Sequence, residues 1–297
     1  MERKTIDQIM HNAQLKKYPD GSAVLLISDR AIFREPGWES VRESSKKIAA
    51  VAVEVEPDLE RGEAQPAERE SGELCTTPHA QRAVESLERA RRRARAKVSD
   101  YAKSNQFDYF VTLTLDAAVI DRYNVDAAVK RLRPFLDNAV RRHGLKYILI
   151  PELHQDGAIH FHGLMNKAFQ MVDSGTIKLT GEGAPKKPKK PRSKKQRQEW
   201  LEAGGQVVYN IADYKLGFST AIGLYGDYNK AVAYVCKYIG KGTGKIGGRW
   251  YYSGGDLKTP SKEYFDVDYA ELRQGEHAFT IRRLGAEVVK LEVSNNG

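Results

Sequence analysis

Cysteine is nearly absent from this sequence of 297 residues, which contains only Cys75 and Cys236. Two cysteines cannot form a cysteine-rich zinc module, and they give no sign of a disulfide framework. No apolar run is long enough to span a bilayer, and no apolar core follows the first four residues as in a secretion signal. The pattern G-x-x-x-x-G-K-[ST] is missing too, since Gly242-Thr-Gly-Lys-Ile246 lacks its spacing and its hydroxyl residue. We therefore expect a cytoplasmic protein without a phosphate-binding loop of this type.

Positive charge is in excess, and it is unevenly spread. The formal net charge is +9, but residues 1–74 carry 11 Lys or Arg against 15 Asp or Glu. Residues 75–297 carry 37 basic against 24 acidic side chains. This distribution favours a polyanionic partner, most simply nucleic acid, over a protein that merely happens to be basic.

Composition divides the chain into four parts. Residues 1–56 are expected to form a small N-terminal module of unknown role, with strands at Ala23–Ser28 and Ile48–Val55. Residues 57–77 are rich in Glu, Pro, Gly and Ala and are typical of a flexible acidic linker. Residues 78–265 form the main domain, and residues 266–297 form a C-terminal extension.

The main domain is expected to begin with a basic helix from Pro78 to Lys103. A modest apolar face is made by Val84, Leu87, Val98 and Tyr101. The arginine cluster in its middle indicates either a solvated helix or one that contacts phosphates. The candidate DNA-binding residues here are Arg91, Arg92 and Arg95.

A strand, a helix and a second strand are predicted next. Phe107–Leu115 alternates, with Val111, Leu113 and Leu115 on one side and Thr112 and Thr114 on the other. The threonines either face a catalytic surface or merely line the strand. Asn124 then caps a helix to about His143, which Gly144 ends and which Pro134 should bend or break in two. Tyr147–Glu152 is unbroken and apolar, as in a central strand.

A hairpin then places metal-ligand residues on one strand face. Asp156-Gly157 between two apolar runs is a strong hairpin signal. A three-residue loop, 155–157, pairs Glu152 with His160 and uses Gly157 in the left-handed conformation. His160 and His162 are two apart, so Glu152, His160 and His162 share a face. Two imidazoles and a carboxylate suit a divalent cation; the alternative is two ordinary histidines on a solvated strand.

A Lys- and Pro-rich insertion follows, at about residues 181–199. It is expected to pack no core, to be mobile, and either to follow a DNA backbone or to keep the protein soluble. The candidate DNA-binding residues here are Lys186, Lys187, Lys189 and Lys190. Further strands are expected at 207–210 and 218–225.

A final helix, Asp227–Lys241, carries two tyrosines one turn apart. Asp227 is its expected N-cap and Gly242 follows its end. Helical geometry places Val232, Val235, Cys236 and Ile239 on one side. Tyr234 and Tyr238 share another side with Lys230, Lys237 and Lys241. The tyrosines are either a packing pair or nucleophiles, whose pKa near ~10 adjacent ammonium groups would lower.

These motifs together resemble the HUH endonucleases. The resemblance rests on Thr112-Leu-Thr114 in an apolar strand, the Glu152-Leu-His…His160-Phe-His162-Gly hairpin, and Tyr234-Val-Cys-Lys-Tyr238-Ile-Gly-Lys241. More narrowly, the Tyr-x-x-x-Tyr helix resembles that of the rolling-circle replication initiators of microviruses and other small single-stranded DNA phages. Residues 249–260 also resemble the segment that follows this helix in phage initiators. The resemblance covers roughly residues 80–260.

The resemblance implies a ferredoxin-like α+β fold, with a central antiparallel sheet flanked by helices, and a specific chemistry. Glu152, His160 and His162 would hold Mg²⁺ or Mn²⁺ on the scissile phosphate. Tyr234 and Tyr238 would attack DNA, aided by Lys237 and Lys241, leaving a 5′-phosphotyrosine and a free 3′-OH. The implied partners are origin DNA, a host helicase and a polymerase in the cytoplasm of a bacterial host, with no membrane.

Two alternatives remain open from sequence. A transposase of the same superfamily could also use two tyrosines, although such enzymes often carry cysteine-rich zinc modules. A relaxase fits less well, because its tyrosine usually precedes the histidines. A non-catalytic module that binds single-stranded nucleic acid is the alternative from a different class.

Overall fold

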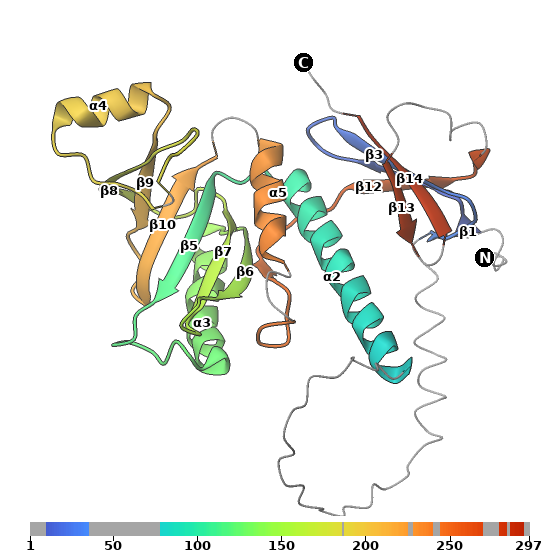
Figure 1. Ribbon diagram of the computed structural model, residues 1–297, viewed down its shortest axis with the longest axis horizontal. Coiled ribbons are helices and arrows are strands. Elements are labelled where there is room, and N and C mark those ends of the chain that lie inside the picture. Colours follow the sequence, from blue (N-terminus) through green and yellow to red (C-terminus); the bar gives the residue numbers. More distant parts are fainter. Residues whose placement is uncertain are drawn as a thin grey trace, which may run out of the picture. The chain divides into compact units, whose positions relative to one another are not determined.

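The computed structural model describes residues 10–35, 78–185, 187–224, 228–239, 244–269, 279–283 and 286–293 (Figure 1). The chain forms two compact units. One comprises Met1–Lys17, Gly21–Gln81 and Ser261–Gly297, and the other comprises Tyr18–Asp20 and Arg82–Pro260. Among the described helices, none combines the length and the apolar character needed to cross a bilayer.

The first unit joins both ends of the chain in one antiparallel sheet. Its strand order is β12 (Ser261–Phe265), β2 (Ala13–Lys17), β3 (Ala23–Ser28), β14 (Ala286–Val293) and β13 (Phe279–Arg283). A separate pair is formed by β1 (Met10–His11) and β4 (Phe33–Arg34). The strand expected at Ala23–Ser28 is confirmed, whereas Ile48–Val55 and the linker at 57–77 lie outside the described residues. The two termini are expected from sequence to be separate segments, but β3 pairs with β14 along its whole length.

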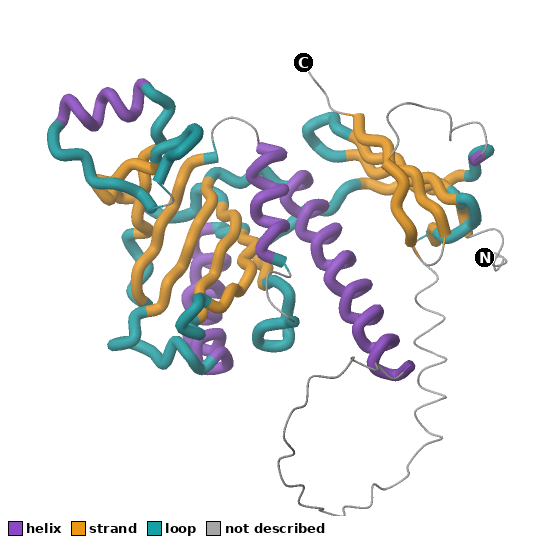
Figure 2. The backbone as a smooth tube through the Cα atoms, viewed as in Figure 1, coloured by secondary structure: helices purple, strands orange, loops and turns teal. Residues whose placement is uncertain are grey.

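The second unit is built on a seven-stranded antiparallel sheet. In spatial order the strands are β11 (Tyr252–Gly254), β6 (Tyr147–Leu153), β7 (Ile159–Met165), β5 (Tyr109–Leu115), β10 (Gly217–Gly223), β9 (Gln206–Ile211) and β8 (Met171–Lys178). The helices are α2 (Pro78–Ser104), α3 (Val125–His143), α4 (Lys194–Glu202) and α5 (Tyr228–Tyr238). Figure 2 shows this central sheet of strands flanked by helices, which confirms the predicted α+β class.

The two sheet faces carry different helices because the strands alternate. On one face Val111, Leu113 and Leu115 of β5 pack against the apolar stripe of α3, together with strand residues such as Leu149 and Phe161. On the other face α2 and α5 pack over Ile148 and Ile150 of β6 and Leu164 of β7. The second face is the one to which Thr112, Thr114 and the two histidines point.

Helix α3 follows its expected boundaries. The side chain of Asn124 accepts a hydrogen bond from the Ala127 amide, and Gly144 ends the helix with φ 63° in the left-handed region. Pro134 does not break the helix in two, because the assignment runs unbroken through it. Pro134 is exposed, so the carbonyl that loses its donor there can be satisfied by water.

The Lys- and Pro-rich insertion contains regular structure that its composition does not predict. Lys189 exchanges two backbone hydrogen bonds with Ile177 of β8, at 2.8 and 2.9 Å. Ser193 caps α4 by accepting from the Gln196 amide, so the last part of the insertion is helical. The expected mobility of the insertion stays a prediction, and Lys186 lies outside the described residues.

Candidate active site

The hairpin between β6 and β7 has the predicted three-residue loop. Glu152 pairs with His160, and the His154 amide donates to the Ala158 carbonyl at 2.8 Å. Gly157 closes the turn with φ 86°, a conformation that glycine adopts without strain. The side chain of Asp156 accepts from the Ala158 amide at 3.0 Å and fixes the turn further. The loop length therefore places Glu152, His160 and His162 on one face, as predicted.

Each histidine is oriented by a threonine of the neighbouring strand. The Oγ1 of Thr112 lies 3.0 Å from Nδ1 of His162, and the Oγ1 of Thr114 lies 3.1 Å from Nδ1 of His160. The threonines thus face the candidate site and do not merely line the strand. Because each hydroxyl occupies the Nδ1 side, the Nε2 atom of each ring is directed away from β5. This is the arrangement by which outer groups commonly orient metal-binding imidazoles.

Glu152 already contacts one of the histidines. Its Oε2 lies 2.9 Å from Nε2 of His162, and both side chains are largely buried. Burial lowers the pKa of His160, with the nearby His154 adding to the effect, which favours the neutral ring that binds metals. Within the described residues, however, no three His, Cys, Asp or Glu side chains stand close enough to hold one ion together. The donor types and the Nε2 directions fit a divalent cation, whereas loading it requires a side chain to move.

Helix α5 brings both tyrosines to this face. The Tyr238 ring stacks on the His162 ring, with centroids 4.3 Å apart and planes 16° from parallel. The hydroxyls of Tyr234 and Tyr238 share a hydrogen bond of 2.8 Å. Phe110 of β5, which was not singled out from sequence, contacts both tyrosine rings and the His162 ring. Its alternation with Thr112 and Thr114 was the available signal.

The two tyrosines differ in their surroundings. Tyr234 is 49% exposed and Tyr238 only 8%, so the shared exposed face that we predicted is correct for Tyr234 alone. The pKa of Tyr238 is raised, first by burial and then by the Tyr234 hydroxyl and the Glu152 charge. The expected lowering of the tyrosine pKa by lysines is therefore wrong for Tyr238. Lys237 lies on α5 within the described part of the chain, whereas Lys241 lies outside it.

The aliphatic side of α5 is confirmed, and α2 holds it in place. Val232, Val235 and Ile239 are buried, with Cys236 partly so. Nε of Arg95 donates to the Ile239 carbonyl at 3.0 Å, where the end of the helix needs donors. The Tyr228 hydroxyl, another residue missed from sequence, donates at the helix start to the Ala102 carbonyl at 2.9 Å.

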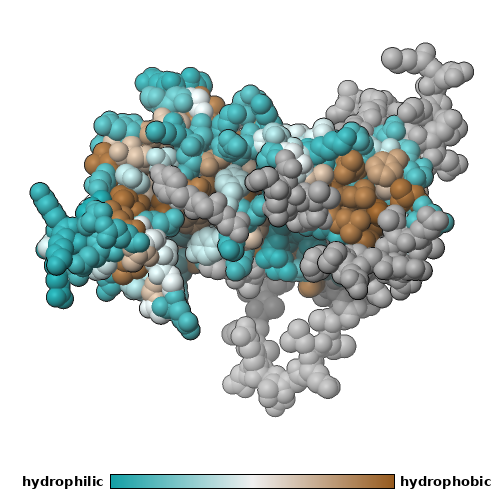
Figure 3. Space-filling model, turned by 90° about the horizontal axis from the view of Figure 1, so that it is seen from above, coloured by the Kyte–Doolittle hydropathy of each residue, from teal (hydrophilic) through white to brown (hydrophobic). Residues whose placement is uncertain are grey.

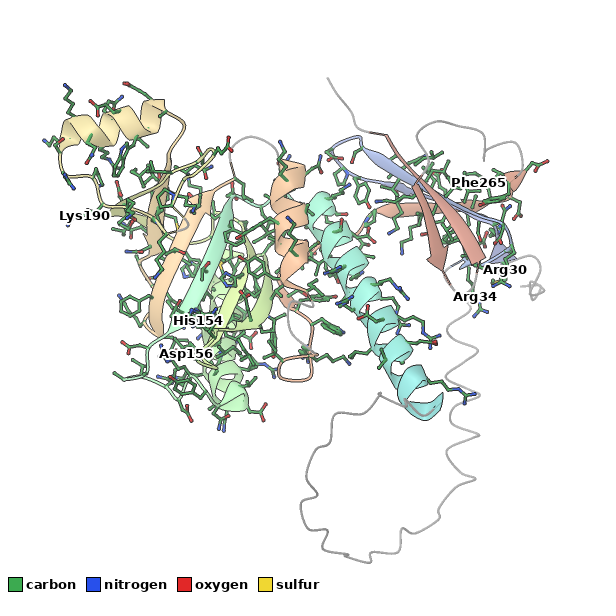
Figure 4. All side chains as sticks on the ribbon, in the orientation of Figure 1. Arg30, Arg34, His154, Asp156, Lys190 and Phe265 are labelled. Atoms are coloured by element: carbon green, nitrogen blue, oxygen red, sulfur yellow. The ribbon has the colours of Figure 1, made fainter. Side chains whose placement is uncertain are left out.

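The candidate DNA-binding residues lie apart from this site. Arg95 is engaged with α5, Arg91 pairs with Glu88 at 2.5 Å, and Arg92 is exposed. Val84, expected on the apolar face of α2, is exposed instead. The exposed side chains of Lys187, Lys189 and Lys190 follow β8, three strands beyond β5 in the sheet. Figure 4 shows Lys190 far from His154 at the hairpin turn, and Figure 3 shows that the end of this unit carrying α4 is largely hydrophilic.

Comparison with known proteins gives one match. Residues 108–243 match the model of the ORF2 family of replication-associated proteins. The matched stretch runs from the start of β5 to just beyond α5 and so includes the hairpin and both tyrosines. It supports a replication-associated protein that acts on DNA. Neither the curated proteins nor the solved structures yielded a match.

Proposed function

We propose that this protein is an HUH endonuclease of the microvirus type, which nicks and rejoins single-stranded origin DNA to initiate rolling-circle replication. One observation carries the proposal: the Tyr238 ring lies on the His162 ring, and its hydroxyl touches that of Tyr234. Two candidate nucleophiles thus adjoin the face that bears the Glu and His donors. This constellation lies within the stretch that matches a replication-associated family.

Glu152, His160 and His162 are the residues that would hold Mg²⁺ or Mn²⁺. The bound ion would supply Lewis-acid activation of a phosphodiester oxygen. Thr112 and Thr114 keep the two imidazoles facing the substrate side through Nδ1. We expect His160→Ala or His162→Ala to abolish metal binding and cleavage together. Glu152→Ala should weaken metal binding less completely, because two imidazoles remain.

The tyrosines perform two exchanges of phosphodiesters. A tyrosine oxygen forms a bond to phosphorus while the bond to the 3′ oxygen breaks, giving a 5′-phosphotyrosine and a free 3′-OH. The 3′-OH primes synthesis, and the second tyrosine cuts the regenerated origin so that a circle is resealed. Each step replaces one phosphodiester by another, so no ATP is consumed. Tyr234 attacks first in this proposal, since its side chain is the more exposed.

The remaining groups have supporting roles. Lys237, and Lys241 beyond the end of α5, would stabilise negative charge on the phosphate. Duplex opening is left to a host helicase and extension to a host polymerase, both in the bacterial cytoplasm.

A covalent-adduct assay tests the proposal. The protein is incubated with Mn²⁺ and a 3′-labelled, randomised pool of single-stranded DNA, and the products are separated on a denaturing gel. Label that migrates with the protein is expected, because attack leaves the 5′-phosphate of the labelled fragment on tyrosine. Binding without any adduct would instead identify a non-catalytic single-strand-binding protein. Sequencing the captured fragments gives the cleavage site.

A further inference from the structure

A row of paired side chains extends the candidate site across the sheet. Glu152 of β6 is opposite His160 of β7, His160 is opposite Thr114 of β5, and Thr114 is opposite Phe218 of β10. Residues directly opposite one another in antiparallel strands point to the same face. Phe218 therefore stands on the histidine face, two strands beyond His160, on the β10 strand seen beside β5 in Figure 1.

The Phe218 ring is left uncovered. It is 71% exposed, more than any other large hydrophobic side chain in the described part of the chain. Helix α5 packs on β6 and β7 and so stops short of this strand. The neighbours of Phe218 on its face, Thr114 and Thr220, are small and polar. An aromatic ring that faces water in line with a candidate active site calls for a partner with an apolar surface.

We infer that Phe218 stacks on a base of the single-stranded DNA next to the scissile phosphate, which rests on the proposed function. Neighbouring strands are ~4.8 Å apart, so Phe218 is displaced by roughly 10 Å from His160 across the sheet. A strand whose phosphate is held at the histidines covers that span within its first few nucleotides. Stacking on an aromatic ring is tolerant of sequence, because every base has a π-face.

Charge favours nucleic acid over a protein as the occupant of this surface. The chain beyond residue 74 has 37 basic against 24 acidic side chains. The exposed Lys187, Lys189 and Lys190 follow β8 of the same sheet, on the side to which the row leads. A strand that runs from the histidines over Phe218 approaches these lysines.

Stacking can be separated from phosphate binding with a base-free probe. Binding of a labelled oligothymidylate is compared with that of an abasic oligomer of equal length, by fluorescence anisotropy. The full-length Tyr234→Phe/Tyr238→Phe protein is used without metal, so no cleavage interferes. Adding Phe218→Ala should weaken oligothymidylate binding on the order of 10-fold and leave the abasic oligomer unaffected. Phe218→Trp should keep the preference for bases, and Phe218→Leu should lose it.

Control variants and a parallel assay decide the outcome. Tyr123→Ala removes a similarly exposed aromatic that lies in a loop outside the row, and it should leave the preference unchanged. An unchanged preference in Phe218→Ala, or an equal loss in Tyr123→Ala, overturns the assignment to Phe218. The adduct assay on the wild-type protein is run alongside. An adduct with no stacking effect refutes this inference alone, whereas the absence of any adduct refutes the proposed function.

Discussion

Two threonine hydroxyls decide how the histidines can serve a metal. A hydroxyl can donate to Nδ1 or accept from it. While His162 donates from Nε2 to Glu152, Thr112 can donate to Nδ1; when Nε2 binds a cation, Thr112 can accept instead. The same side chain therefore supports the ring before and after metal loading. Valine has the same shape as threonine but can do neither.

We expect Thr112→Val to weaken Mn²⁺ binding by about 10- to 100-fold, as is usual when a metal-bound histidine is deprived of its hydrogen-bond partner. Calorimetric titration of the metal-free protein measures this directly, without reference to activity. Thr220→Val is the matched control, because Thr220 is opposite Thr112 on the next strand and lies one strand further from the histidines. If both variants bind Mn²⁺ equally well, the hydroxyl of Thr112 has no role in the metal site.

The two tyrosines should be partly interchangeable. Their hydroxyls are hydrogen-bonded to each other, so either can approach the same phosphate after a small movement. We expect Tyr234→Phe and Tyr238→Phe each to form a covalent adduct once, more slowly for Tyr234→Phe, and the double variant to form none. Neither single variant should complete repeated cycles of nicking and resealing on a captured cleavage-site oligonucleotide. A Tyr238→Phe protein that cycles normally would reduce Tyr238 to a packing role against His162.

At the scale of elements, the hairpin could be predicted because its determinants are local. Asp156 and Gly157 specify the turn, and the turn specifies which side chains share a face. The caps of α3, at Asn124 and Gly144, are local in the same sense. The burial of Tyr238 could not be predicted, since it depends on Phe110 and His162, which are distant in sequence. Strand β8 was missed because its alternation is weak and its partner β9 follows a long insertion.

Strand β7 depends on a glycine beside the candidate catalytic face. A Cβ on Gly163 would stand 1.8 Å from the Ile148 carbonyl oxygen, which belongs to the backbone of β6 and cannot move aside. We expect Gly163→Ala to separate the two strands and to lower the free energy of unfolding by about 1–3 kcal/mol or more. Urea denaturation measures the change. Gly244→Ala, where a Cβ meets nothing within 4 Å, should leave stability nearly unchanged, and equal destabilisation of both variants would contradict the steric explanation.

At the scale of the whole molecule, long-range pairing was the part that sequence could not reveal. Strands β3 and β14 are both typical strand sequences, but nothing local in either indicates that Val24 pairs with Glu292. The expectation of a separate N-terminal module therefore missed its C-terminal strands. The role of this unit stays open, because its sheet includes neither the hairpin nor α5.

The distribution of charge over the large sheet makes the final prediction. Lys187, Lys189 and Lys190 are exposed next to β8, whereas Lys130, Arg131 and Arg142 are exposed on α3, which covers the opposite sheet face. Replacing each set by glutamine removes the same charge from the protein. A single strand bound on the histidine face should contact the first set only. Substitution avoids deleting the segment, which would also remove the hydrogen bonds between Lys189 and Ile177.

We expect the first triple variant to flatten the slope of log affinity against log salt by ~0.7 for each phosphate that the protein no longer neutralises, with weaker binding at low salt. The α3 triple variant should keep the wild-type slope. Anisotropy with an oligothymidylate over a series of salt concentrations measures both. The rate of adduct formation at saturating DNA should be unchanged in either variant, since neither set reaches the tyrosines. Equal flattening by both sets would mean that net charge alone attracts DNA, and that the strand has no preferred path across the sheet.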